Sequence, residues 1–156
     1  VVGYGRLGKM MYNFCKAFNA EVMVFDPLEG NIGCSCIEEM FEKSDVISLH
    51  VHVTDETKYM INKQLLGLMK KNSYIVNTSR GEIVDEQAIV KALESGKLAG
   101  YATDVVEQEF GNISESPIIQ AMKRGENILI TPHIGGMTIE GQQKAYEWSI
   151  SKLEKK

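Results

Sequence analysis

The chain has 156 residues, of which 44% are hydrophobic and 24% are charged, and its net charge is −4. This length and composition are typical of one soluble globular domain. The acidic balance argues against non-specific nucleic-acid binding, and the sequence shows neither an apolar run long enough to span a bilayer nor a secretory signal.

Hydrophobic runs alternate with helical patterns along the chain. The expected order is strand 1–2, helix 7–18, strand 22–25, helix 37–41, strand 46–51, helix 65–69, strand 74–76, helix 85–95, strand 98–102, helix 118–122, strand 128–130 and helix 139–153. Asp85 is the expected N-cap of its helix, Gly96 ends that helix, and residues 110–117 form the longest loop. This alternation predicts an α/β fold with a doubly wound parallel sheet.

The two ends of the chain predict a domain excised from a longer protein. Val1 and Val2 directly precede Gly3, as if the first strand were truncated, and Lys155 and Lys156 close a helix. We therefore expect residues 1–156 to form one dinucleotide-binding domain, with a substrate domain outside this chain.

The three cysteines are expected to be reduced, as in a cytoplasmic protein. Cys34 and Cys36 are too close in sequence to form an easy disulfide, and Cys15 lies on a predicted helix. A metal site at Cys34 and Cys36 would need further ligands nearby, so no metal is expected.

A glycine-rich turn, GYGRLG, connects the first strand to the first helix. Gly3 allows the tight turn, Gly5 lets the backbone approach a pyrophosphate, and Gly8 allows close helix–strand packing. The helix N-terminus offers free N–H groups to phosphates, and Arg6 adds a positive charge. These features predict a dinucleotide site.

Asp26 follows the second predicted strand, about 20 residues beyond the glycines, where a ribose ligand is expected. Its carboxylate would accept hydrogen bonds from the adenosine ribose and repel a 2′-phosphate, which favours NAD over NADP. The alternative is a simple turn residue before Pro27.

An arginine, a glutamate and a histidine each follow a predicted strand: Arg80 in NTSRG, Glu109 in DVVEQE and His133 in TPHIGG. The carboxyl ends of parallel strands meet at one edge of a sheet, so these residues can converge. Arg80 would bind a 2-keto acid, His133 would move the proton, and Glu109 would fix the tautomer of the histidine. Asp104 would position the nicotinamide amide.

Each catalytic candidate has a structural alternative. Arg80 could be a surface residue beside a turn, His133 could cap a turn, and Glu107 competes with Glu109 for the role of the carboxylate. His50 and His52 alternate along a strand, and we interpret them as structural.

These segments resemble the NAD-binding domain of the D-isomer-specific 2-hydroxyacid dehydrogenases. The resemblance runs from GYGRLG through VFDP, SDVISLHVHVTDETKYMIN and NTSRGEIVDEQAIVKALESGKLAGYATDV to ITPHIGGMT. It implies that Arg80 binds substrate, that Glu109 and His133 are catalytic, and that Asp26 binds ribose. The expected cofactor contacts also include Leu7, Thr78 and Gly135. The resemblance further implies a cleft between two domains and a homodimer formed through this one.

Two positions depart from the family pattern, because His52 and Phe110 stand where proline is common. Glu109 itself differs from the glutamine of the similar formate dehydrogenases. Two other functions compete with a dehydrogenase. A non-catalytic NAD-sensing corepressor keeps the same three residues, and an NAD-using Rossmann hydrolase is disfavoured because its lysine and aspartate pattern is not evident.

Overall fold

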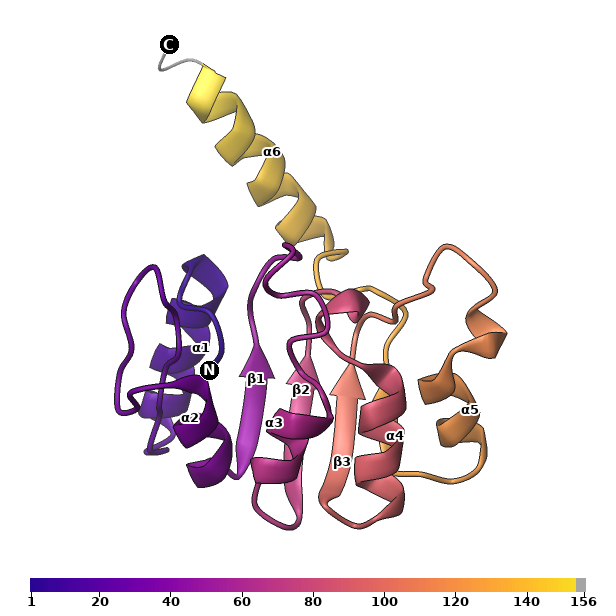
Figure 1. Cartoon of the computed structure of the whole chain (residues 1–156). Helices are drawn as coiled ribbons and strands as arrows, with labels where there is room; N and C mark the ends of the chain where they lie inside the picture. The colour runs from indigo at the N-terminus through magenta and orange to yellow at the C-terminus, as the bar shows by residue number, and fades with distance from the viewer. Residues whose placement is uncertain (154–156) are drawn as a thin grey trace.

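A four-stranded parallel sheet forms the centre of the computed structural model, which describes residues 1–153 (Figure 1). The strands lie side by side in chain order: β1 (Val46–Leu49), β2 (Ser73–Asn77), β3 (Leu98–Thr103) and β4 (Ile128–Ile130). All three pairings are parallel. The last four expected strands are therefore confirmed, with small shifts at their ends.

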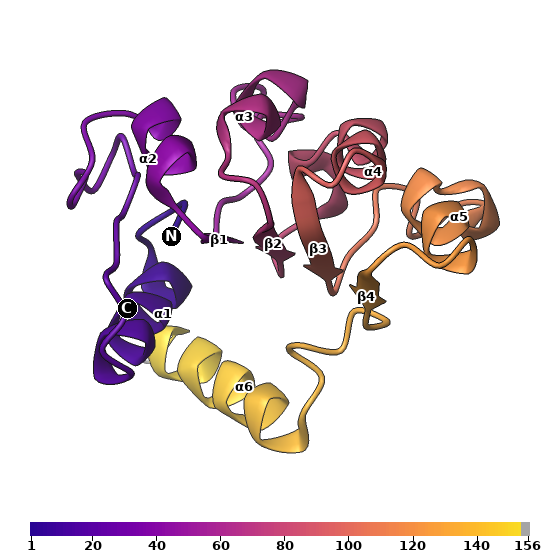
Figure 2. The same ribbon diagram turned by 90° about the horizontal axis from the view of Figure 1, so that it is seen from below.

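Helices lie on both sides of the sheet, as in a doubly wound fold, but only one side is closely packed (Figure 2). They are α1 (Arg6–Ala17), α2 (Ile37–Lys43), α3 (Lys63–Leu68), α4 (Glu86–Glu94), α5 (Pro117–Lys123) and α6 (Ile139–Leu153). Helices α2 to α5 lie on one face, and α1 and α6 lie on the other. Two short 3₁₀ turns, Gly81–Ile83 and Ile113–Glu115, were not expected from the sequence. Lys155 and Lys156 lie outside the described residues.

The first two expected strands are reduced to isolated bridges. Val2 bridges Phe25 on one side and Leu49 on the other, both in parallel. Val24 pairs antiparallel with Ile32, so the expected strand at 22–25 forms sheet contacts only at its end. Val2 lies in the sheet between Phe25 and Leu49. The chain therefore continues first on one side of Val2 and then on the other. This switch point is where α/β sheets bind ligands.

The core fills the space between the sheet and helices α2 to α5. Ile47, Leu49 and Ile75 of the strands are fully buried, and Ile89 of α4 is buried against them. Burying one such side chain contributes about 1.5–3 kcal/mol. Asp85 caps α4 as expected, because its Oδ1 accepts a hydrogen bond from the N–H of Ala88 at 3.0 Å. Gly96 ends α4 with a φ of 68°.

The opposite face of the sheet is largely uncovered, and we call it the open face. Its exposed apolar side chains come from α1 and from the strands: Leu7 (65% exposed), Met10, Phe14, Phe18, Tyr74 and Leu129. Helix α1 buries only Gly8, and α6 buries none of its residues. The apolar stripe predicted for the first helix therefore exists but is exposed. No helix among residues 1–153 is long and apolar enough to cross a membrane.

Candidate active site

Three neighbouring strands deliver the predicted catalytic residues to one edge of the sheet. Arg80 follows β2, Glu109 follows β3 and His133 follows β4, so all three lie beyond the carboxyl ends of their strands. Because β3 lies between β2 and β4, the Glu109 segment emerges between the other two. The three strands that these residues follow therefore end at the same edge of the sheet.

Glu109 and His133 are in direct contact. His133 Nδ1 forms a short hydrogen bond with Glu109 Oε1, and both side chains are partly exposed. A carboxylate at Nδ1 favours the tautomer with its proton there, which leaves Nε2 free to exchange a proton with a substrate. Glu107, the competing acid, instead accepts a hydrogen bond from the hydroxyl of Tyr59. This bond raises the pKa of Tyr59 to about 12.

The turn that carries His133 is built around Asp104. His133 has a φ of 51°, a left-handed conformation that is uncommon for residues other than glycine. Its N–H donates to the carbonyl of Asp104 at 2.9 Å. The Asp104 carboxylate accepts hydrogen bonds from the Thr131 hydroxyl, from Ile134 N at 3.0 Å and from Gly135 N at 2.8 Å.

These bonds control the charge of Asp104. Burial by itself would raise the pKa of this carboxyl, but the donors from Thr131, Gly135 and Ile134 outweigh it and lower the pKa. Sequence reasoning expected Asp104 to hold the nicotinamide amide. The structure gives the carboxylate an additional task, which is to hold the histidine turn.

Buried polar residues fix the turn that carries Arg80. The amide of Asn77, which is fully buried, donates to the carbonyl of Arg80 at 2.9 Å and accepts from Ser79 N at 3.0 Å. The Ser79 hydroxyl donates to the carbonyl of Leu49 at 2.7 Å and so ties this turn to β1. The exposed Arg80 donates to the carbonyl of Ser79 at 2.6 Å, so the pair of Glu109 and His133 forms without it.

Sequence reasoning missed the residues that support the site: Asn77, Ser79, Thr131 and Tyr59. Asn-x-Ser after a strand is a typical turn pattern, so Asn77 and Ser79 carried a local signal. Tyr59 carried none, because its contact with Glu107 joins segments far apart in the sequence.

The glycine turn has the close contacts expected of a phosphate-binding loop. Gly3 has a φ of 91°, and a Cβ there would lie 2.5 Å from the carbonyl oxygen of His50. A Cβ on Gly8 would overlap the carbonyl of Gly3, whereas the space above Gly5 is open. Gly5 caps α1 without a side-chain hydrogen bond, so the N–H groups of the first turn remain available.

Asp26 lies directly beside this turn. Its Oδ2 accepts a hydrogen bond from Tyr4 N at 2.6 Å, and its Oδ1 accepts from Leu28 N and Glu29 N. Burial would raise the pKa of Asp26, but these backbone donors outweigh it and lower the pKa. The carboxylate is therefore charged and close to the glycines, as its proposed contact with ribose requires.

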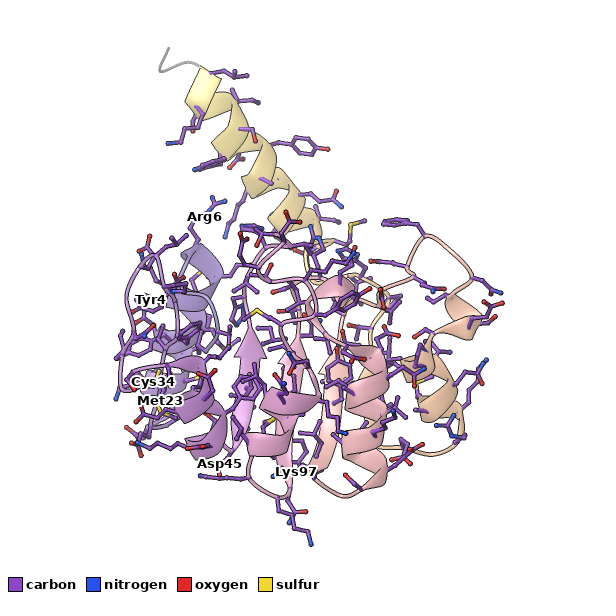
Figure 3. All side chains as sticks on the ribbon, viewed as in Figure 1. Tyr4, Arg6, Met23, Cys34, Asp45 and Lys97 are labelled. Carbon is purple, nitrogen blue, oxygen red and sulfur yellow. The ribbon has the colours of Figure 1, made fainter. Side chains whose placement is uncertain are left out.

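The other predicted cofactor residues are on the surface. Arg6 stacks on the ring of Trp148 in α6, with its Cζ 4.8 Å from the ring centroid, and Figure 3 shows it extending toward that helix. Leu7 and Thr78 are exposed. Gly135 is held by Asp104. The three cysteines are free, and residues 1–153 contain no cluster of His, Cys, Asp and Glu suited to a metal ion.

A mainly apolar recess of about 460 Å³ borders the pair of Glu109 and His133. Its walls include Glu109 and His133 together with Val105, Ile119 and Met122.

Comparison with known proteins identifies the family. The family described as D-isomer specific 2-hydroxyacid dehydrogenase, NAD binding domain, matches residues 1–135. The glyoxylate reductase of Thermofilum pendens is 35% identical over 161 residues, covering 98% of this chain and 46% of the relative. The chain spans less than half the length of such curated relatives.

Two solved structures have the same fold. D-lactate dehydrogenase from Aquifex aeolicus, complexed with NAD and lactic acid, superposes with a TM-score of 0.84 at 31% identity, covering 98% of this chain and 51% of that one. An acyclic imino acid reductase, in complex with NADPH and D-Arg, has a TM-score of 0.85 at 28% identity, with coverages of 98% and 48%. With its glycine turn, its Glu109–His133 pair and these matches, the chain belongs to the NAD-binding domains of the D-isomer specific 2-hydroxyacid dehydrogenases.

Proposed function

We propose that this chain is the NAD-binding half of an oxidoreductase that moves a hydride between NAD(H) and a 2-hydroxy or 2-keto acid. The contact between Glu109 and His133, at the edge that also carries Arg80, is the observation that supports this reaction most strongly. A dehydrogenase of this kind needs one group to transfer a proton and one cation to bind a carboxylate. These residues supply both.

When bound, NADH would supply the hydride that reduces the carbonyl carbon of a keto acid. The imidazolium of His133 donates its Nε2 proton to the alkoxide that develops on the carbonyl oxygen. Glu109 stabilises that imidazolium through Nδ1 and keeps the ring in one orientation. Arg80 would turn its guanidinium to the substrate carboxylate, which its planar fork fits. Oxidation of a hydroxy acid is the reverse, with neutral His133 as the base.

The residues proposed for NAD binding surround the switch point. Gly3, Gly5 and Gly8 with Arg6 would hold the pyrophosphate, and Asp26 would bind the adenosine ribose. Asp104 would position the nicotinamide amide, and Leu7, Thr78 and Gly135 would be further contacts with the cofactor. One structural neighbour carries NADPH, so the fold alone does not choose the cofactor. The charged Asp26 favours NAD because it would repel a 2′-phosphate.

The active enzyme would need a second domain, because this chain spans only 46% of the glyoxylate reductase and 51% of the D-lactate dehydrogenase that it matches, and the family resemblance implies a cleft between two domains. We propose that residues 1–156 form one dinucleotide-binding domain beside a substrate domain and that the protein is a cytoplasmic homodimer. The open face, with exposed Phe14, Tyr74 and Leu129, supports a subunit contact through this domain. Light scattering of the full-length protein would test this contact, and a monomer would contradict it.

The decisive experiment follows NADH oxidation by the full-length protein against a panel of 2-keto acids. His133→Ala should reduce turnover by about 10²-fold or more while leaving the Kd for NADH nearly unchanged. Glu109→Gln should also reduce turnover, whereas the matched variant Glu107→Gln should not. Absence of turnover in the wild-type protein, with NADH still bound, would favour an NAD-sensing module instead.

A further inference from the structure

One buried acid has no part in the proposed chemistry. Glu86, in the first turn of α4, is only 4% exposed. Its Oε1 accepts a hydrogen bond from Glu107 N at 3.0 Å, and its Oε2 accepts from the Ser116 hydroxyl at 2.7 Å. It takes part in none of the salt bridges among residues 1–153. Two hydrogen bonds and the positive end of α4 therefore stabilise this buried carboxylate.

Both hydrogen bonds lead to the segment that carries Glu109. Glu107 lies just before Glu109, and Ser116 lies at the far end of the loop, where it is fully buried and caps α5. Between these anchors the loop is mostly exposed, and Phe110 is 99% exposed. Glu86 thus forms hydrogen bonds with both ends of an exposed loop, and Glu109 lies within this loop.

The segment that carries Glu109 also packs against the turn that carries Arg80. Gly81, next to Arg80, packs so closely on Val106 and Glu107 that a Cβ at this position would overlap their backbone. The arginine turn and the glutamate segment are therefore in direct contact. Glu86 lies a few residues beyond Gly81 and bonds to the same stretch of backbone. The packing of Gly81 and the hydrogen bond of Glu86 therefore both fix the distance between the arginine turn and the segment of Glu109.

We propose that Glu86 is a positioning residue, which holds the Glu109 carboxylate against His133 and keeps its segment in register with the turn of Arg80. Glu86 touches neither substrate nor cofactor in this role. The inference rests on the proposed function for its catalytic consequence. The orientation of the imidazole can nevertheless be measured without any substrate.

Kinetics of the full-length protein test the catalytic consequence. Glu86→Leu removes both acceptors while filling a similar volume, so kcat should fall by up to about 10²-fold, the cost of a displacement near 1 Å. The Kd for NADH should stay nearly constant because Glu86 forms its hydrogen bonds with Glu107 and Ser116, which are not among the residues proposed to bind NAD. Glu86→Gln can still accept from Glu107 N and donate to Ser116, so it should restore kcat to within about tenfold. Glu94→Gln, an exposed acid on the same helix, is the matched control and should match the wild type.

The ¹⁵N chemical shifts of the His133 ring, in protein labelled at histidine, test the positioning itself. In its neutral form the wild-type ring should carry its proton on Nδ1, and Glu109→Gln should weaken that preference. Glu86→Leu should change the ring in the same direction, and Ser116→Ala, which removes only one bond, should do so to a smaller extent. An unchanged ring in a folded Glu86→Leu or Ser116→Ala protein would overturn the proposal. A wild-type protein with an oriented ring but no turnover would instead contradict the proposed function alone.

Discussion

The substitution Asp104→Asn tests whether this carboxylate holds the histidine turn. The asparagine oxygen can still accept from Thr131 and Ile134, but its amide nitrogen would face the N–H of Gly135, now at 2.8 Å from Asp104 Oδ2. One charge-assisted hydrogen bond is lost, and the others become bonds to a neutral acceptor. The expected loss in the free energy of unfolding is about 2–4 kcal/mol.

The dependence on pH distinguishes this mechanism from simple loss of packing. The pKa of Asp104 is lowered in the folded protein from an ordinary value of 3.8. A lowered pKa means that the carboxylate stabilises the fold fully at pH values above its ordinary pKa of 3.8. This stabilisation is lost as the pH falls through the lowered pKa of the folded protein. The difference between the wild type and Asp104→Asn should therefore be largest at pH 7 and should shrink below about pH 4.

Urea unfolding of this chain at a series of pH values measures that difference. In thermal unfolding at pH 7, the melting temperature of Asp104→Asn should be lower by roughly 5–15 °C, as expected for a domain of this size. Asp55→Asn, at an exposed position, controls for the loss of one charge and should change neither the free energy of unfolding nor the melting temperature. A difference that stays constant from pH 7 down to pH 3, or that grows in acid, would refute the assignment of these hydrogen bonds.

Two further substitutions test the assignments of Asp26 and Glu107. Asp26→Ala should raise affinity for NADP relative to NAD by at least about tenfold, because it removes a like charge from the 2′-phosphate. Calorimetric Kd values for both cofactors measure this ratio, and an unchanged ratio would leave Asp26 as a turn residue. Glu107→Gln should lower the pKa of Tyr59 from about 12 toward its ordinary value, because Tyr59 loses its charged acceptor. Phenolate absorbance against pH, with Tyr59→Phe to assign the signal, would show no such shift if Glu107 did not accept this bond.

Local sequence patterns were sufficient for most of the fold. The helix at 139–153 and the strand at 128–130 have the bounds expected from their apolar residues, and Asp85 caps α4 as predicted. Short-range physics explains this success, because capping, helical spacing and turn residues act within a few positions of one another. The strand expected at 22–25 largely failed because its pairing depends on Ile32 and Val2, not on its own apolar residues.

The sequence by itself determined which chemical groups lie at the carboxyl edge of the sheet, because the residues that follow each strand can be read from it directly. The spacing of the residues left open whether Glu107 or Glu109 contacts the histidine, since both follow β3 at similar distances, and only the family resemblance favoured Glu109. Only the tertiary structure decided this, by bringing Tyr59 to Glu107 and the left-handed turn of His133 to Glu109. The support from Glu86 and Asp104 was invisible for the same reason. Hydrogen bonds between distant segments form when the chain packs, and no local pattern encodes them.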